Sequence, residues 1–277
     1  MEKSPRLIDV VVLQFDVILG QIDTNIQTVR RMMAGVKADV VVLPELCFSG
    51  YALPDMAAWK AVSDEAAVTR MMDALKALAK QHDTVIVAGL SEWLDGALYN
   101  VAVIVDANGM IGKHQKINRT DNERFFTAGD TLAVHRALGL NIGMLVCFDS
   151  WFPEPFRILS LLKADLICLP ANFGGPWTLD VVKVRALENG VPLILANRIG
   201  TETLDGEPAT FRGHSLIVDS GGNVLAAAGS EETVLKATIP IHAGDRNRCI
   251  ISQDMAAERA RYHPFVRYTT TPAKKHQ

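Results

Sequence analysis

Short apolar runs alternate with segments of helical periodicity along most of this chain. In the first half, apolar runs of strand length lie at 7–14, 38–43, 84–90, 98–106 and 110–116. Apolar residues recur at helical spacing over 22–36 and 68–78, which predicts two amphipathic helices, the second capped by Ser63. The turn sequence at 106–109 predicts that the last two strands form a hairpin.

The second half repeats this order of elements. Strands are predicted at 141–146, 165–169, 192–196, 214–218, 224–227 and 233–239, with helices at 154–163 and 178–189. Two halves of one β-α-β-α-β-β plan predict an α/β protein, an α-β-β-α sandwich of two mixed sheets with helices outside. No linker-like segment divides the chain, so we expect a single domain over 1–277, with the tail at 243–277 on the surface or at an oligomer interface.

Composition and charge exclude several classes of protein. The chain has 277 residues, of which 49% are hydrophobic and 21% charged, and its net charge of −3 offers no basic surface for nucleic acid. No apolar run approaches the roughly 18–20 residues that cross a bilayer, and the N-terminus lacks a signal-peptide core. The four cysteines are too widely spaced for a disulfide framework or a zinc site. We therefore expect a cytoplasmic protein without a membrane, nucleic-acid or metal partner.

Three residues with potentially reactive side chains lie where predicted strands end. Glu45 follows the run at 38–43, Lys116 ends the hairpin, and Cys147 follows the strand at 141–146. Open α/β sheets place their active sites at such strand ends, and a helix starting near Pro153 would help to lower the pKa of the thiol. Each residue also fits a structural role: Glu45 as a capping acid, Lys116 as a solvated strand end, and Cys147 as a small buried side chain.

Together the three residues form a coherent catalytic set. A thiol needs a base, and a carboxylate in a desolvated pocket can have its pKa raised into the useful range. The ammonium of Lys116 and the backbone N–H of Phe148 can stabilise the oxyanion of a tetrahedral intermediate. The segment at 213–217 lacks the second glycine of a serine nucleophile elbow. His114, His214 and His242 fit surface or hairpin positions better than metal sites, and His214 stays open as a partner of the thiol.

These motifs, in this order, resemble the nitrilase (carbon–nitrogen hydrolase) superfamily over residues 7–239. The matching segments in the first part of the chain are Leu43-Pro44-Glu45-Leu46, Ser49-Gly50-Tyr51, Gly112 with Lys116, and Cys147-Phe148-Asp149 with Phe152-Pro153-Glu154. The later segments are Arg185-Ala186-Leu187-Glu188-Asn189, Ala196-Asn197-Arg198 with Gly200, and Phe211-Arg212-Gly213-His214-Ser215.

The resemblance implies an α-β-β-α sandwich that assembles into homodimers or larger oligomers, with no metal or organic cofactor. It implies that Glu45 is the general base, Cys147 the nucleophile and Lys116 the oxyanion stabiliser. A second glutamate common in the family matches Glu123, which is expected to orient the lysine or assist proton transfer; a surface acid in a charged loop is the alternative.

Two departures from the family pattern bear on the substrate. Many members read Arg-Lys-x-His-Leu around the lysine, whereas this chain reads Gln115-Lys116-Ile117-Asn118-Arg119. Nitrilases commonly read Cys-Trp-Glu at the nucleophile, whereas the form here, Cys147-Phe148-Asp149, is similar to that of amidases and N-carbamoyl hydrolases. Nitrile hydrolysis is therefore the less favoured chemistry.

Residues near the predicted strand ends are candidates for substrate binding. Asn172, Phe173 and Trp177 follow the strand after the cysteine helix and are expected to line the pocket. A substrate carboxylate would need a cation, and the candidates are Arg119, Arg198 and Arg212, of which Arg198 also fits a structural role. The segment 201–210 fits a lid or an oligomer contact.

The sequence thus predicts a hydrolase that cleaves the C–N bond of a small amide through a cysteine thioester and releases ammonia. An N-carbamoyl amine or acid is the alternative substrate class. Two further functions stay open: a glutaminase-like ammonia supplier that acts with a partner protein, and a non-catalytic binding protein on the same fold.

Overall fold

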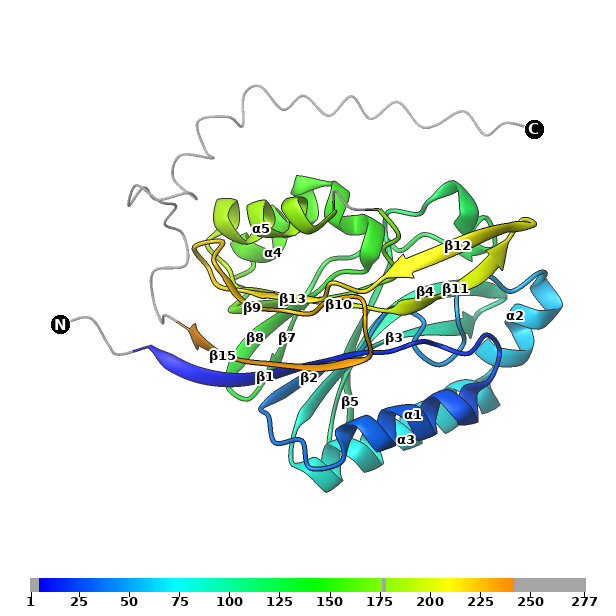
Figure 1. Cartoon of the computed structure of the whole chain (residues 1–277), viewed down its shortest axis with the longest axis horizontal. Helices are drawn as coiled ribbons and strands as arrows, with labels where there is room; N and C mark the ends of the chain where they lie inside the picture. The colour runs from blue at the N-terminus through cyan, green and yellow to red at the C-terminus, as the bar shows by residue number, and fades with distance from the viewer. Residues whose placement is uncertain (1–4, 176–177, 242–277) are drawn as a thin grey trace.

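Two large sheets pack face to face between two layers of helices in the computed structural model, which describes residues 5–175 and 178–241 (Figure 1). The first sheet runs in the order β15 (Thr233–Ile241), β1 (Arg6–Gln14), β2 (Val40–Val42), β3 (Val85–Leu94), β4 (Ala97–Asp106) and β5 (Gly109–Gln115), and the short β6 (Phe126–Thr127) pairs with β4. The second sheet runs in the order β14 (Val224–Ala227), β13 (Leu216–Val218), β10 (Leu193–Asn197), β9 (Leu166–Ala171), β8 (Leu140–Met144) and β7 (Val134–Ala137).

Each sheet is mixed and has three parallel strands at its centre. In the first sheet β1, β2 and β3 are parallel, and in the second β8, β9 and β10 are parallel. The other pairings between neighbouring strands, β1 with β15 and β3 with β4 among them, are antiparallel, apart from that of the short β6. The predicted α-β-β-α sandwich of two mixed sheets is therefore confirmed.

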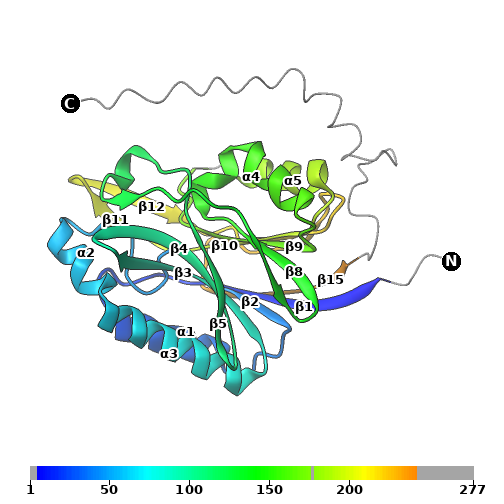
Figure 2. The same cartoon turned by 180° about the vertical axis from the view of Figure 1, so that it is seen from behind.

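The helices lie on the outer faces of the two sheets. α1 (Ile22–Met33) and α3 (Glu65–His82) cover the first sheet, whereas α4 (Pro153–Leu161) and α5 (Thr178–Asn189) cover the second (Figure 2). Long apolar strands buried on both faces are what such a layered arrangement requires, because each sheet contacts helices on one side and the other sheet on its second side.

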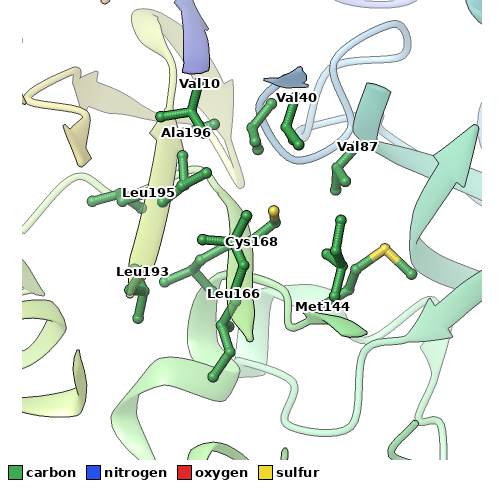
Figure 3. Close-up of a cluster of buried hydrophobic side chains, with 14 of the residues drawn as sticks. Val10, Val40, Val87, Met144, Leu166, Cys168, Leu193, Leu195 and Ala196 are labelled. Atoms are coloured by element: carbon green, nitrogen blue, oxygen red, sulfur yellow. The ribbon is translucent and has the colours of Figure 1, made fainter. Parts of the chain in front are cut away.

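Alternation along β1 shows how the strands serve both faces. Val10 and Val12 belong to the cluster between the sheets, whereas Val11 and Leu13 pack with the side chains of α1 and α3. Successive side chains of a strand point to opposite faces, so one apolar run supplies both cores. Val10, Val40 and Val87 from the first sheet lie opposite residues of the second sheet, Met144 and Cys168 among them (Figure 3).

Several details differ from the sequence-based expectation. Ser63 ends the additional helix α2 (Met56–Ser63) and donates a hydrogen bond to Ser91, and it is Asp64 that caps α3 through the N–H of Ala67. The segment 201–210 forms most of a hairpin of β11 (Ile199–Leu204) and β12 (Glu207–Arg212). The predicted tail at 243–277 lies outside the described residues. No helix in the described ranges is both long and apolar enough to span a membrane.

Gly89 on β3 allows the chain after β2 to lie directly on the sheet. A Cβ at Gly89 would lie 2.4 Å from Cα of Glu45 and 2.7 Å from the carbonyl oxygen of Pro44. The Gly89 N–H donates to that oxygen, and its own carbonyl accepts from the N–H of Cys47. The absence of a side chain at Gly89 thus leaves room for the Glu45 backbone, and the two hydrogen bonds hold that backbone against β3.

We expect Gly89→Ala to lower the free energy of unfolding by about 1–3 kcal/mol, the usual cost of forcing extra atoms into a packed core. Urea denaturation would measure this. Gly229→Ala is the matched control, because its added Cβ meets no atom within 4 Å. Equal stability of the two variants would contradict the close approach at Gly89.

Candidate active site

The structure brings together the three residues that the sequence places at strand ends. Glu45 follows β2 and Lys116 follows β5 in the first sheet, whereas Cys147 lies beyond β8 in the second. The side chains of Glu45 and Lys116 are 0% and 1% exposed, so neither is a solvated surface charge. The two facing sheets therefore contribute to one buried site.

Lys116 donates hydrogen bonds to two buried carboxylates. Its Nζ lies 2.8 Å from Oε1 of Glu45 and 2.5 Å from Oε1 of Glu123. Glu123 ends the short 3-10 helix η1 (Asp121–Glu123), and its side chain is 1% exposed. Glu123 is therefore a buried partner of the lysine and not a surface acid.

Asn100 on β4 links the same two carboxylates and was missed from the sequence. Its Nδ2 lies 2.6 Å from Oε1 of Glu45 and 3.2 Å from Oε1 of Glu123. The second oxygen of Glu123 accepts from the N–H of Thr120, whose hydroxyl lies 3.1 Å from that of Tyr51. The available signal was a single amide residue within the apolar run at 98–106.

Cys147 begins the short 3-10 helix η2 (Cys147–Trp151) with a left-handed backbone, at φ 44°. It is 7% exposed and has a hydrogen bond with the backbone of Asn172 at the end of β9. The backbone N–H of Phe148 lies in the first turn of η2, where N–H groups lack partners within a helix. The backbone N–H groups of Asn172 and Phe148 therefore lie where they can stabilise negative charge near the sulfur.

Burial and neighbouring charges set the protonation states of the site. Burial raises the pKa of Glu45, an effect that the Lys116 ammonium opposes and the Glu123 carboxylate reinforces. Burial opposes the charge of Lys116, but the neighbouring carboxylates of Glu45 and Glu123 outweigh it and raise the lysine pKa well above its usual range. Burial and Glu45 also raise the pKa of the Cys147 thiol. The resting site therefore holds an ammonium beside a neutral thiol.

The residues predicted to bind substrate differ in where the structure places them. Asn172 and Phe173 are 7% and 6% exposed, and the side-chain amide of Asn172 has no hydrogen-bond partner among the described residues. Arg119 is exposed, and its guanidinium donates to the carbonyl of Phe126. Trp177 lies outside the described residues. Asn172 is thus a buried amide beside the cysteine with unused hydrogen-bonding capacity.

The other two candidate arginines separate clearly. Arg198 is fully buried, donates to Asp16, Glu202 and the carbonyl of Val17, and stacks on Phe211, so its role is structural. Arg212 is exposed on β12. His214 is also exposed, and no contact brings it to Cys147. Within the ranges that the structure describes, no group of three His, Cys, Asp or Glu side chains is arranged to hold a metal ion.

Comparison with known proteins shows the family. The sequence profile of the carbon–nitrogen hydrolase family matches residues 10–246, and the chain belongs to that family of hydrolases, which act on non-peptide C–N bonds. A nitrilase from Pyrococcus abyssi is 34% identical over 231 residues, 82% of this chain and 87% of the relative. An N-carbamoylputrescine amidase from Solanum lycopersicum is 31% identical over 268 residues, 86% of this chain and 87% of the relative.

Solved structures have the same fold. The amidase from Nesterenkonia sp. superposes with a TM-score of 0.77 at 23% identity, covering 94% of this chain and 97% of that one. The α/β architecture of two helix-flanked mixed sheets is therefore that of nitrilase-superfamily proteins.

We expect Asn100→Leu to raise the pKa of Glu45 further, because it removes a hydrogen bond that favours the charged carboxylate. A carbon-13 NMR titration of protein labelled at the glutamate carboxyl carbons would measure the shift. Asn108→Ala, in the exposed turn after β4, is the control and should leave the Glu45 pKa unchanged. An unchanged or lower pKa in Asn100→Leu would contradict the assigned role.

Proposed function

We propose that this chain hydrolyses the C–N bond of a small amide through a thioester on Cys147 and releases ammonia. The observation that carries the proposal is the single buried group formed by Glu45, Lys116, Glu123 and the Cys147 thiol, with no water-exposed charge among them. A nucleophile, a proton acceptor and a fixed cation are the three parts that acyl transfer to a thiol needs.

The first half of the cycle makes the thioester. Glu45 takes the thiol proton as the sulfur of Cys147 attacks the amide carbon, and the carbonyl electron pair moves onto oxygen. The Lys116 ammonium and the Phe148 N–H stabilise that oxyanion. The intermediate then collapses: the C–N bond breaks, and Glu45 returns its proton to the departing nitrogen as ammonia leaves.

The second half releases the acid. Water loses a proton to Glu45 as it attacks the thioester carbon, the C–S bond breaks, and the sulfur regains the proton from Glu45. Glu123 keeps the ammonium oriented throughout through its 2.5 Å contact with Nζ. Metal or organic cofactors have no step in this cycle.

The raised thiol pKa fits attack that is coupled to proton transfer. Because burial and the Glu45 carboxylate both disfavour a resting thiolate, the proton moves only as the sulfur bonds to carbon. A base with a raised pKa suits this step, because its pKa lies closer to those of the thiol and the leaving nitrogen with which it exchanges a proton.

An N-carbamoyl amine is the second candidate substrate. One relative, at 31% identity, is an N-carbamoylputrescine amidase, so its name gives an N-carbamoyl amine as the substrate of that relative. The buried, unpartnered amide of Asn172 beside Cys147 can donate to and accept from either an amide or a carbamoyl group.

A panel assay separates the candidates. Ammonia release would be followed with ω-amides, aliphatic amides, N-carbamoyl amines and acids, and nitriles. We expect release from an amide or carbamoyl compound that Cys147→Ala abolishes. Cys168→Ala is the matched control, because Cys168 is a buried cysteine on β9 and should leave activity intact. If the wild-type protein released no ammonia from any compound of the panel, the proposed hydrolysis would be contradicted.

The pH dependence follows from Glu45. The proposed base must be ionised before attack, so activity should fall as the pH drops through its pKa. Burial raises that pKa, so the acid limb of kcat/KM should lie above the value near 4.3 of an ordinary glutamate. A pH profile with the best substrate of the panel would measure the limb. A midpoint at or below that value would contradict Glu45 as the base.

We also propose that the chain forms a homo-oligomer through the outer face of its second sheet's helices. Five large apolar side chains on η2, α4, α5 and the adjoining residues are more than a third exposed: Trp151, Phe152, Ile158, Leu162 and Val184. Contiguous exposed apolar residues are typical of protein interfaces. Val184→Glu should lower the mass measured by light scattering, whereas Met110→Glu, on the edge strand β5 of the first sheet, should not. Equal masses of wild type and Val184→Glu would contradict this interface.

A further inference from the structure

Asp149 is a fully buried carboxylate for which the proposed cycle has no chemical step. It lies two residues after Cys147, and its exposure is 0%. Its Oδ1 accepts hydrogen bonds from the backbone N–H groups of Ile117 and Asn118, at 3.2 Å and 2.8 Å. Its Oδ2 accepts from the N–H of Val146 at 3.0 Å and lies 3.0 Å from Nε2 of His114.

These contacts join the two segments that carry the nucleophile and the cation. Val146 immediately precedes Cys147, whereas Ile117 and Asn118 immediately follow Lys116. The cysteine segment comes from β8 in the second sheet and the lysine segment from β5 in the first. No backbone hydrogen bond between β5 and β8 is available to hold them, because the two strands belong to different sheets.

The same carboxylate closes the turn on which Cys147 stands. The Asp149 N–H donates to the carbonyl of Val146 at 3.0 Å, while Oδ2 of Asp149 accepts from the N–H of Val146. Cys147 between them has φ 44°, in the left-handed region that a residue with a side chain occupies at an energetic cost. Such a conformation persists only where surrounding contacts enforce it.

We propose that Asp149 is a positioning residue that sets the separation of the Cys147 sulfur and the Lys116 ammonium. The expected effect of Asp149 on catalysis rests on the proposed function. Its effect on the relative position of the two segments rests on the hydrogen bonds alone. Asp149 touches neither reacting group. It acts through the backbone on both sides, so that the nucleophile and the oxyanion stabiliser move as one unit.

Asparagine cannot replace Asp149 in this role. It has the same shape, but one of its two terminal atoms is an NH2 group, which only donates. At Oδ1 that group would face the N–H groups of Ile117 and Asn118, and at Oδ2 it would face the N–H of Val146. In either orientation a donor opposes a donor in a fully buried place, and one of the two segments must move away.

The test compares Asp149→Asn with Asp165→Asn. Asp165 is also a buried aspartate, 4% exposed, and its Oδ2 accepts from the N–H of Asn141 near the start of β8, the end remote from Cys147. Both substitutions weaken a buried carboxylate contact and should lower the thermal unfolding temperature. Only Asp149→Asn should disturb the site.

Two readouts separate positioning from stability. In Asp149→Asn, kcat should fall about 100-fold, the effect of an error of about 1 Å in reacting geometry, while KM changes little. The alkylation rate of Cys147 by iodoacetamide, followed by peptide mass spectrometry, should fall about tenfold, because a displaced sulfur loses its base and its cation. Asp165→Asn should keep wild-type values of both.

The alkylation arm needs no substrate, so it distinguishes this inference from the proposed function. Slow alkylation only in Asp149→Asn would support the positioning role even if the wild-type protein hydrolysed no amide. Wild-type or faster alkylation in Asp149→Asn would overturn it, as would equal losses in the two variants, which would reduce Asp149 to an ordinary buried contact.

Discussion

The Lys116 ammonium lies in the interior between two carboxylates, and the rest of the site depends on this arrangement. Removing these ions from water costs several kcal/mol each, and close pairing and hydrogen bonding offset that cost. Glu45, Glu123 and the amide of Asn100 provide that pairing, at distances between 2.5 and 3.2 Å. The cluster keeps one excess negative charge when both carboxylates are ionised. Burial raises the pKa of the neighbouring thiol, and the Glu45 charge raises it further. Glu45 thus has two roles: its carboxylate stabilises the Lys116 ammonium and is the proposed base for the thiol.

The two-sheet fold is what makes such a cluster tolerable. Each sheet ends several strands at a common edge, and the face-to-face packing brings the two edges together around the site. The first sheet supplies the charged residues and the second the nucleophile, so neither sheet alone contains a reactive centre. The contacts of Gly89 with Pro44 and Cys47 and those of Asp149 with both segments fix the parts in place. Precision of this kind comes from rigid backbone contacts around the reacting groups.

Sequence patterns were sufficient for the architecture and for the placement of Glu45, Lys116 and Cys147, because strand periodicity and strand ends are local signals. The bounds of α5, 178–189, match the prediction, whose end was set by the glycine that follows, Gly190, at φ 63°. Contacts between distant segments were beyond the same reasoning. Asn100 looked like a lone polar residue in a strand, and its contact with Glu45 spans 55 positions. His114 does lie on the hairpin strand, as predicted, but it is buried against Asp149. Helix α2 was missed because its segment, Met56–Ser63, has only 8 residues, about two helical turns, which is too short for a clear apolar pattern.

The most direct test of hydrolysis through Cys147 is to trap the covalent thioester intermediate. The protein would be mixed with the amide or carbamoyl compound that it turns over fastest, quenched with acid during turnover, digested, and analysed by mass spectrometry. We expect the peptide containing Cys147 to gain the mass of the acyl group and hydroxylamine to remove it, as is typical of a thioester. Turnover by the wild-type protein without an adduct on Cys147, or an adduct on another residue, would contradict the thioester mechanism.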